Sequence, residues 1–99
     1  MVRINWTFQA KDYLKAIADY ISKDSKRYGK LQVTRLKNRT RVLKNQPHIG
    51  KVVPEINREN IRELIEGSYR IIYKIVEDNQ IDILTIHHSA RDLRRRKVK

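Results

Sequence analysis

Positively charged side chains are the most prominent chemical groups in this sequence. The chain of 99 residues has 23 Lys and Arg against 11 Asp and Glu, which gives a formal net charge of +12. In the segment 26–45, five of these cations recur at helical spacing, with no acid between them. Such a stripe is either a solvated helix face or a surface for an anionic partner, because like charges on one stripe repel each other. The stripe consists of Lys26, Lys30, Lys37, Arg41 and Lys44.

The scarce residue types exclude other kinds of chemistry. The sequence has no cysteine, which excludes disulfides, thiolate zinc sites and cysteine nucleophiles. The three histidines are too few for a His-rich metal site, so we expect neither a metal nor a cofactor. No apolar run could form a transmembrane helix, and the N-terminus lacks the apolar core of a secretory signal. We therefore expect a cytoplasmic protein that does not enter a membrane.

The charge is distributed unevenly along the chain. Residues 1–50 hold 12 basic and 3 acidic side chains, whereas residues 51–99 hold 11 and 8. A chain this basic is typical of a protein that contacts a polyanion or an acidic protein. Residues 94–99 form a basic tail, which we expect to act as a flexible electrostatic arm.

The first half of the sequence has the pattern of one strand and two helices. Alternation over residues 2–6 predicts a short strand, and apolar residues at helical spacing predict a helix over residues 8–22. A second helix is predicted over residues 26–45, because Pro47 and Gly50 terminate it. The short break between the two segments predicts a helical hairpin.

The second half has the two-residue period of strands. Val52 and Val53 precede a proline and predict a short edge strand. Longer strands are predicted over residues 61–66, 69–76 and 81–87, and Gly67-Ser68 is a hairpin signal. The resulting order, β-α-α-β-β-β-β, predicts an α+β domain with a helical hairpin on one face of a mostly antiparallel sheet. The residues expected in its core are Leu14, Ile17, Leu36, Leu43, Ile72 and Leu84.

Several short motifs follow one another in this order along almost the whole chain. They are a Gly50-Lys51…Pro54-Glu55 turn, an Ile61–Leu64 strand (IREL), a Tyr69–Tyr73 strand (YRIIY) and a terminal His88-x-x-Arg91-Asp92. Over roughly residues 2–93, this ordered set resembles the RelE/ParE superfamily of type II toxins, most closely its ParE branch.

The resemblance implies a single toxin domain over residues 1–93 in a bacterial or archaeal cytoplasm. It also implies a cognate antitoxin that wraps the toxin with a disordered segment, so we expect a toxin–antitoxin hetero-oligomer. The superfamily divides by target. RelE-like members cut mRNA in the ribosomal A site, whereas ParE-like members poison DNA gyrase.

The resemblance also suggests residues for a nuclease mechanism. Metal-free RNA cleavage requires a base, a cation that stabilises the phosphate and an acid for the leaving oxygen. By resemblance, Arg70 takes the place of the family's strand arginine, His88 lies close to a position used by some ribonuclease members, and Glu55 lies on a loop that sometimes carries a carboxylate. The chain departs from the RelE pattern, because Lys51 stands alone and no tyrosine follows His88. Because the chain has few of the acid–base residues of a nuclease, the sequence favours gyrase binding. A ribosome-dependent mRNA endoribonuclease is the alternative.

Each of these three residues also has a purely structural interpretation. Arg70 can form a cross-strand ion pair with Glu63 or Glu66. His88 can be a strand-end histidine that bonds to Asp92 or to backbone, and Glu55 can be an ordinary turn residue.

A second group of residues is predicted to bind protein partners. Tyr28, Leu31 and Val42 form an apolar strip on a helix that is already buried along another face, which is typical of a partner surface. The strip lies on the flank of the helix opposite the basic stripe, and the C-terminal arginines belong to the segment that most resembles the gyrase-directed branch. The predicted partner-binding residues are Tyr28, Leu31, Lys37, Arg41, Val42, Arg91, Arg94, Arg95 and Arg96.

Overall fold

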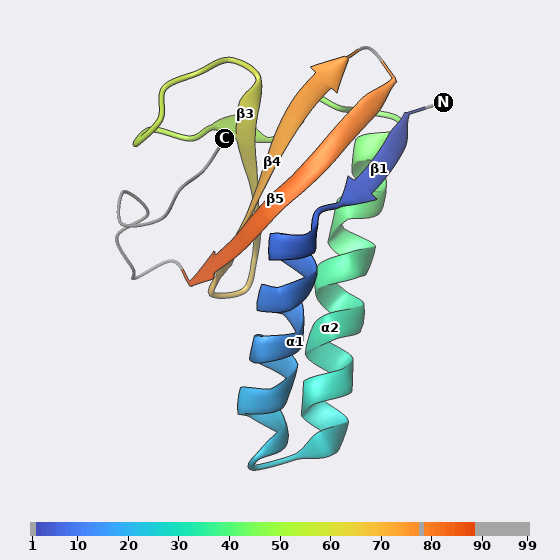
Figure 1. Ribbon diagram of the computed structural model, residues 1–99, viewed down its shortest axis with the longest axis vertical. Coiled ribbons are helices and arrows are strands. Elements are labelled where there is room, and N and C mark those ends of the chain that lie inside the picture. Colours follow the sequence, from blue (N-terminus) through green and yellow to red (C-terminus); the bar gives the residue numbers. More distant parts are fainter. Residues whose placement is uncertain (1, 78, 89–99) are drawn as a thin grey trace.

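The computed structural model describes residues 2–77 and 79–88, and its element order confirms the predicted α+β fold (Figure 1). The elements are β1 (Arg3–Trp6), α1 (Phe8–Ser22), α2 (Lys26–Thr40), the 3-10 helix η1 (Arg41–Lys44), β2 (Lys51–Val52), β3 (Ile61–Glu66), β4 (Tyr69–Glu77) and β5 (Gln80–His88). The α-helical part of the second helix is shorter than predicted, because its last turn tightens into η1. The basic tail at 94–99 lies outside the described residues. Within the described residues, no helix is both long enough and apolar enough to span a membrane.

Side-chain caps and one glycine define the helical hairpin. The Thr7 hydroxyl accepts a hydrogen bond from the Ala10 N–H at 3.2 Å, and the Ser25 hydroxyl accepts one from the Tyr28 N–H at 3.3 Å. Both bonds satisfy N–H groups that the first turn of a helix leaves unpaired. A Cβ atom on Gly29 would collide with Ser22 and with the backbone of Ala18, so the glycine allows α1 and α2 to pack closely.

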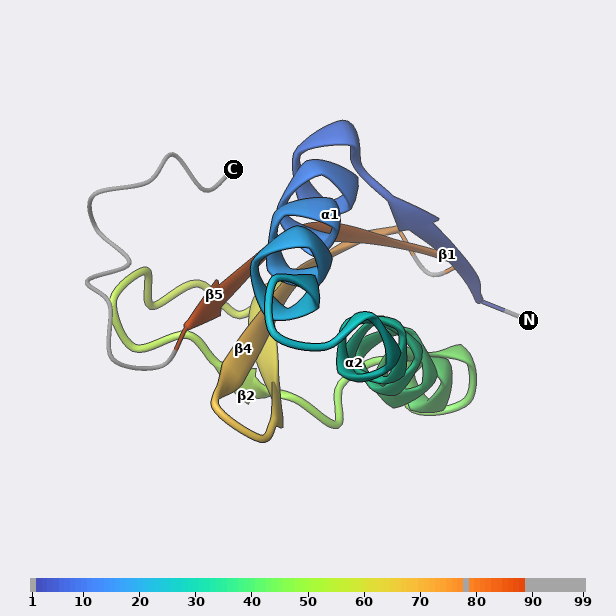
Figure 2. The ribbon, with the colours of Figure 1, turned by 90° about the horizontal axis from the view of Figure 1, so that it is seen from below.

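The five strands form one mixed sheet in the order β1-β5-β4-β3-β2. β1 pairs with β5 in parallel, and the other neighbouring strands are antiparallel. Gly67 has a φ of 60° in the tight turn between β3 and β4, a conformation that glycine adopts without strain. Both helices lie on one side of the sheet (Figure 2).

The main core lies between the helical hairpin and this face of the sheet. Leu14, Leu36 and Leu43 are buried there, as predicted. Ile17 is half-buried at the margin of the same core. The sheet contributes Leu64, Ile71, Tyr73, Ile81, Ile83 and Ile86.

A smaller core lies on the opposite face of the sheet. Val53, Ile61 and Ile72 are fully buried there, and Ile56 and Leu84 pack against them. Ile72 is therefore buried as predicted but on the face away from the helices, whereas Leu84 is only half-buried. Since Val53 and Ile56 belong to the connection between β2 and β3, this loop covers part of the second face.

Candidate functional site

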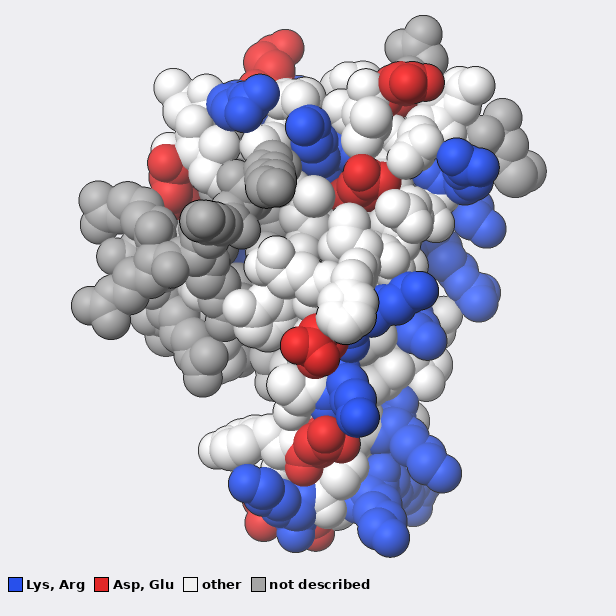
Figure 3. Space-filling model, viewed as in Figure 1, with Lys and Arg blue, Asp and Glu red and all other residues white. Residues whose placement is uncertain are grey.

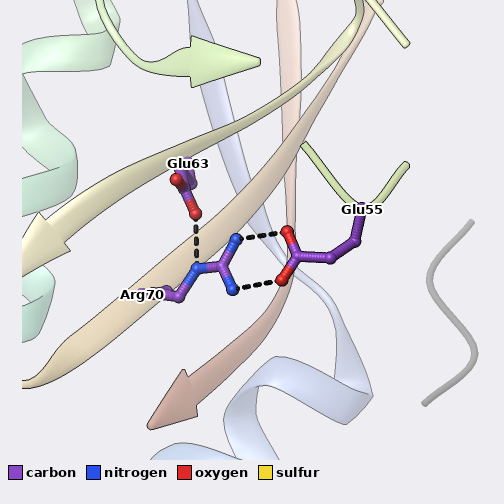
Figure 4. A network of polar contacts seen from close by, with 3 residues as sticks. All are labelled: Glu55, Glu63 and Arg70. Carbon is purple, nitrogen blue, oxygen red and sulfur yellow. Dashed lines mark hydrogen bonds and ion pairs between the residues drawn. The ribbon is translucent and has the colours of Figure 1, made fainter. Parts of the chain in front are cut away.

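Arg70 of β4 is the centre of a polar network on the sheet face away from the helices (Figure 4). Its Nε donates to Glu63 Oε1 at 2.5 Å, and its Nη1 and Nη2 donate to the two carboxylate oxygens of Glu55 at 2.7 and 2.9 Å. Glu63 comes from the neighbouring strand β3 and Glu55 from the β2–β3 loop. The network therefore contains one of the two predicted cross-strand pairs, whereas the bidentate pair with Glu55 was not anticipated.

The two carboxylates hold the guanidinium in a largely buried position. The Arg70 and Glu63 side chains are 10% and 8% exposed. The hydrogen bonds from Arg70 lower the pKa of Glu55 to about 2, and its carboxylate in turn raises the pKa of Arg70 above its ordinary value. Each of the three guanidinium nitrogens donates to a carboxylate, so Arg70 has to leave Glu55 before it can bind a phosphate in the same bidentate manner.

The two adjacent histidines lie on opposite faces of the sheet. Arg70 pairs with His87 in the β4–β5 register, and Tyr69 pairs with His88. Successive side chains of a strand point to opposite faces, so His87 shares the face of Arg70 whereas His88 faces the helices. His87 is buried and also contributes to the low pKa of Glu55, after the larger effect of Arg70.

The structure thus brings together two of the three predicted catalytic residues. Arg70 and Glu55 are in contact, whereas His88 lies on the other side of the sheet. Sequence reasoning missed His87 as the histidine of this cluster. The two-residue period of β5 gives no signal for it, because the register shift between Ile72 and Tyr73 places both Ile83 and Ile86 in the main core and so reverses the alternation before His87.

An apolar groove runs between α1 and the sheet on the helix-covered face. Its cavity volume is about 540 Å³, and the ring of His88 meets Tyr69 edge to face inside it. Tyr20 on its rim is 73% exposed. The groove was not predicted, although Tyr13 and Tyr20, seven residues apart, lie on one helix face. Its lining residues are Tyr13, Ala16, Ile17, Tyr20, Tyr69, Ile86 and His88.

The predicted apolar strip on the second helix is only partly exposed. Tyr28 is 63% exposed and Leu31 is 38% exposed. Val42, by contrast, is half-buried and packs against the main core, because it lies in η1 where the chain turns back towards the sheet. Arg39 donates to the backbone oxygen of Ile65 at 3.1 Å and ties α2 to β3.

The other predicted partner-binding residues belong to α2, to η1 and to the C-terminal segment. Lys37 and Arg41 are exposed. Arg91, Arg94, Arg95 and Arg96 lie outside the described residues. Within residues 2–77 and 79–88, no group of three or more His, Cys, Asp or Glu side chains could hold a metal ion.

A helical hairpin on one face of a five-stranded sheet of this order is a fold that the chain shares with a solved structure. The sequence model described as the ParE toxin of the type II toxin–antitoxin system parDE matches residues 4–93, and the chain belongs to this family. The chain is similar to Toxin RelE2 of Caulobacter vibrioides, with 31% identity over 91 residues that cover 92% of this chain and 99% of the relative. Its fold is that of a chain in the solved chromosomal ParDE TA system from P. aeruginosa, with a TM-score of 0.73 and 22% identity over 89% of this chain and 96% of that one.

The protein is therefore a toxin of a type II toxin–antitoxin system in the RelE/ParE superfamily. This membership gives it an antitoxin as its partner.

Proposed function

We propose that this toxin arrests growth in the cytoplasm by binding DNA gyrase, without acid–base chemistry of its own, and that its antitoxin neutralises it. The observation that carries the proposal is the bidentate pair between Arg70 and Glu55, with Glu63 on the third guanidinium nitrogen. A cation that stabilises a phosphorane must face the phosphate, and this guanidinium faces two carboxylates instead.

The position of His88 supports the same proposal. A general acid has to lie within hydrogen-bond reach of the group it protonates. His88 is separated from Arg70 by the sheet itself, so the two side chains cannot act on one phosphodiester. A binding surface requires no such convergence.

The test is to express the toxin alone and to determine which of two early events comes first, the DNA damage response or the bulk decay of mRNA. Gyrase poisoning predicts induction of the DNA damage response before any bulk decay of mRNA. Codon-phased mRNA cuts before DNA damage signalling would contradict the proposal. Co-expression of the antitoxin should abolish the arrest and provides the control for specificity.

A ribosome-dependent mRNA endoribonuclease is the second candidate. The relative named Toxin RelE2 favours it, and so does the cluster of Arg70, Glu55 and His87 on one face, which contains a cation, a carboxylate and an imidazole. This candidate requires Glu55 to release Arg70 when RNA binds. Glu55→Gln should then preserve or raise mRNA cleavage in a translation extract, while Arg70→Ala should abolish it.

We propose that the antitoxin contacts the exposed flank of α2 at Tyr28 and Leu31. Both side chains are apolar and solvent-accessible, and together they form a surface that a folding antitoxin segment can cover. Leu31→Asp should weaken the toxin–antitoxin complex while the toxin stays folded. Val76→Asp, at an exposed apolar position of β4, is the matched control and should leave the affinity unchanged.

A further inference from the structure

A second groove, between α1 and α2, has a basic rim over an apolar floor. Its cavity volume is about 350 Å³. Lys11 and Lys15 of α1 line one side, and Lys37 of α2 lines the other. We call it the hairpin groove; its floor consists of Trp6, Leu14 and Val33.

The cations of α2 extend this basic rim along the helix. At 100° per residue, Lys26 and Lys30 lie within about 20° of Lys37 around the helix. Arg41 and Lys44 follow in η1. No Asp or Glu occurs between residues 26 and 44. In Figure 3, Lys and Arg side chains accordingly gather along the lower right edge of the molecule, where α2 lies.

Among residues 2–77 and 79–88, none of these cations has an acidic side chain within salt-bridge distance. In the described part of the chain, Lys11, Lys15, Lys37 and the four cations that extend the row form no salt bridge, whereas Arg70 forms two. Pairs such as Lys11–Lys15 and Lys26–Lys30 lie four residues apart on a helix, a spacing at which like charges destabilise each other. An external polyanion would relieve this repulsion.

The geometry of the row fits a duplex nucleic acid. Within α2 (Lys26–Thr40), the rise of about 1.5 Å per residue places Lys26 and Lys37 about 17 Å apart along the helix axis, which corresponds to about five base pairs at 3.4 Å each. Proteins that bind single strands use exposed aromatic side chains on which bases stack. The aromatic residue of the hairpin groove, Trp6, is half-buried in the floor and packs against the main core.

The row is separate from the flank that we assign to the antitoxin. Around α2, Leu31 and Tyr28 lie about 120–180° from Lys37. We propose that the hairpin groove and the α2 cations bind the phosphate backbone of a duplex nucleic acid, without base recognition. This proposal goes beyond the choice of target, because it concerns the helical hairpin and does not depend on gyrase.

The test is fluorescence anisotropy of the full-length protein with a labelled 20-base-pair duplex over a range of salt concentrations. The triple variant Lys11→Gln, Lys15→Gln, Lys37→Gln should bind at least tenfold more weakly at about 0.1 M salt. Loss of three phosphate contacts should also reduce the slope of log K against log salt by about 2–3. The same three lysines changed to Arg should restore both values.

A control variant loses the same charge elsewhere. Lys51→Gln, Arg58→Gln, Lys74→Gln changes β2, the β2–β3 loop and β4, and should keep the wild-type slope. Equal weakening by both triples would overturn the proposal, because it would show a net-charge effect without a site. Two other results would also overturn the proposal. One is a 20-nucleotide single strand that binds as tightly as the duplex, and the other is polyglutamate that displaces the labelled duplex as well as unlabelled duplex does at equal charge. DNA and RNA duplexes are measured side by side. Binding of either duplex that the Lys11, Lys15, Lys37 triple variant weakens supports the proposal and identifies the kind of nucleic acid that is bound.

Discussion

Arg70 and His87 stand opposite each other in the β4–β5 ladder, on the face of the sheet that the helices leave uncovered. The neighbouring pair, Tyr69 and His88, faces α1. Substitutions of the two adjacent histidines therefore report on different faces of the molecule. This separation supports the proposal that the toxin acts by binding, together with the pairing of Arg70 and Glu55.

The first prediction compares the two histidines. His88 is exposed, so His88→Gln should leave both folding and growth arrest nearly intact. His87 is 1% exposed, so His87→Gln should lower the free energy of unfolding by about 1–3 kcal/mol through its buried contacts. Growth curves with matched expression levels and chemical denaturation of both variants check this. A folded but non-toxic His88→Gln protein would contradict it.

The second prediction concerns the counter-ion of the network. Arg70→Met leaves the carboxylates of Glu55 and Glu63 without a cation, so we expect a loss of about 3–5 kcal/mol in the free energy of unfolding. Arg70→Lys should lose less, because it keeps the charge but not the bidentate geometry. Adding Glu55→Gln and Glu63→Gln to Arg70→Met should recover part of the loss. Urea denaturation followed by circular dichroism measures all three steps.

The third prediction is a pH dependence of stability. The pKa of Glu55 is about 2 in the folded protein and 4.5 in the unfolded chain. The unfolded chain therefore binds the proton first, and the stabilisation from this carboxylate is complete above about pH 5 and is lost as the pH falls towards 2. The difference in unfolding free energy between wild type and Glu55→Gln should shrink over this range. A difference that stays constant from pH 6 to pH 2 would show that the pair does not form.

The fourth prediction uses two leucines of the same helix. Leu36 is fully buried, so Leu36→Ala should cost about 2–5 kcal/mol, a large share of the stability of a domain this size. Leu31→Ala removes the same atoms from an exposed position and should cost far less. Thermal unfolding of both variants makes the comparison, and a wild-type melting temperature for Leu36→Ala would show that the orientation of α2 is wrong.

The fifth prediction tests a buried hydroxyl. Tyr73 Oη accepts a hydrogen bond from the Gly50 N–H at 3.0 Å and donates one to the Pro47 carbonyl at 2.8 Å. Tyr73→Phe leaves both backbone groups without this partner, so we expect a loss of about 1–3 kcal/mol. Tyr69→Phe, at a half-buried position of the same strand, is the control and should cost less. Equal free energies of unfolding for Tyr73→Phe and Tyr69→Phe would contradict the hydrogen bonds of Tyr73 to Gly50 and Pro47.

The elements of the fold could be predicted because their signals are local. The capping residues Thr7 and Ser25 and the turn at Gly67 each act within a few residues, and the structure confirms the elements they delimit. The order of the elements follows from the order in which these local signals occur along the chain. The tightening of the second helix after Thr40 was not visible, because the cations there are compatible with either helix type.

The candidate site could be predicted only in part, because it depends on long-range pairing. Glu55 reaches Arg70 across 15 residues of sequence through a loop in which Asn57 has a φ of 54°. The β4–β5 register also shifts between Ile72 and Tyr73, and such a shift changes which residues of β5 share a face with Arg70. No local pattern encodes either feature, so the sequence suggested His88 where the fold provides His87.

The most direct test of the central claim is the supercoiling activity of purified gyrase in the presence of the purified full-length toxin. The proposal predicts inhibition that saturates near one toxin per gyrase subunit, persists in His88→Gln and is reversed by the antitoxin. Unimpaired supercoiling at a large excess of toxin, together with codon-phased mRNA cleavage in a translation extract, would contradict it.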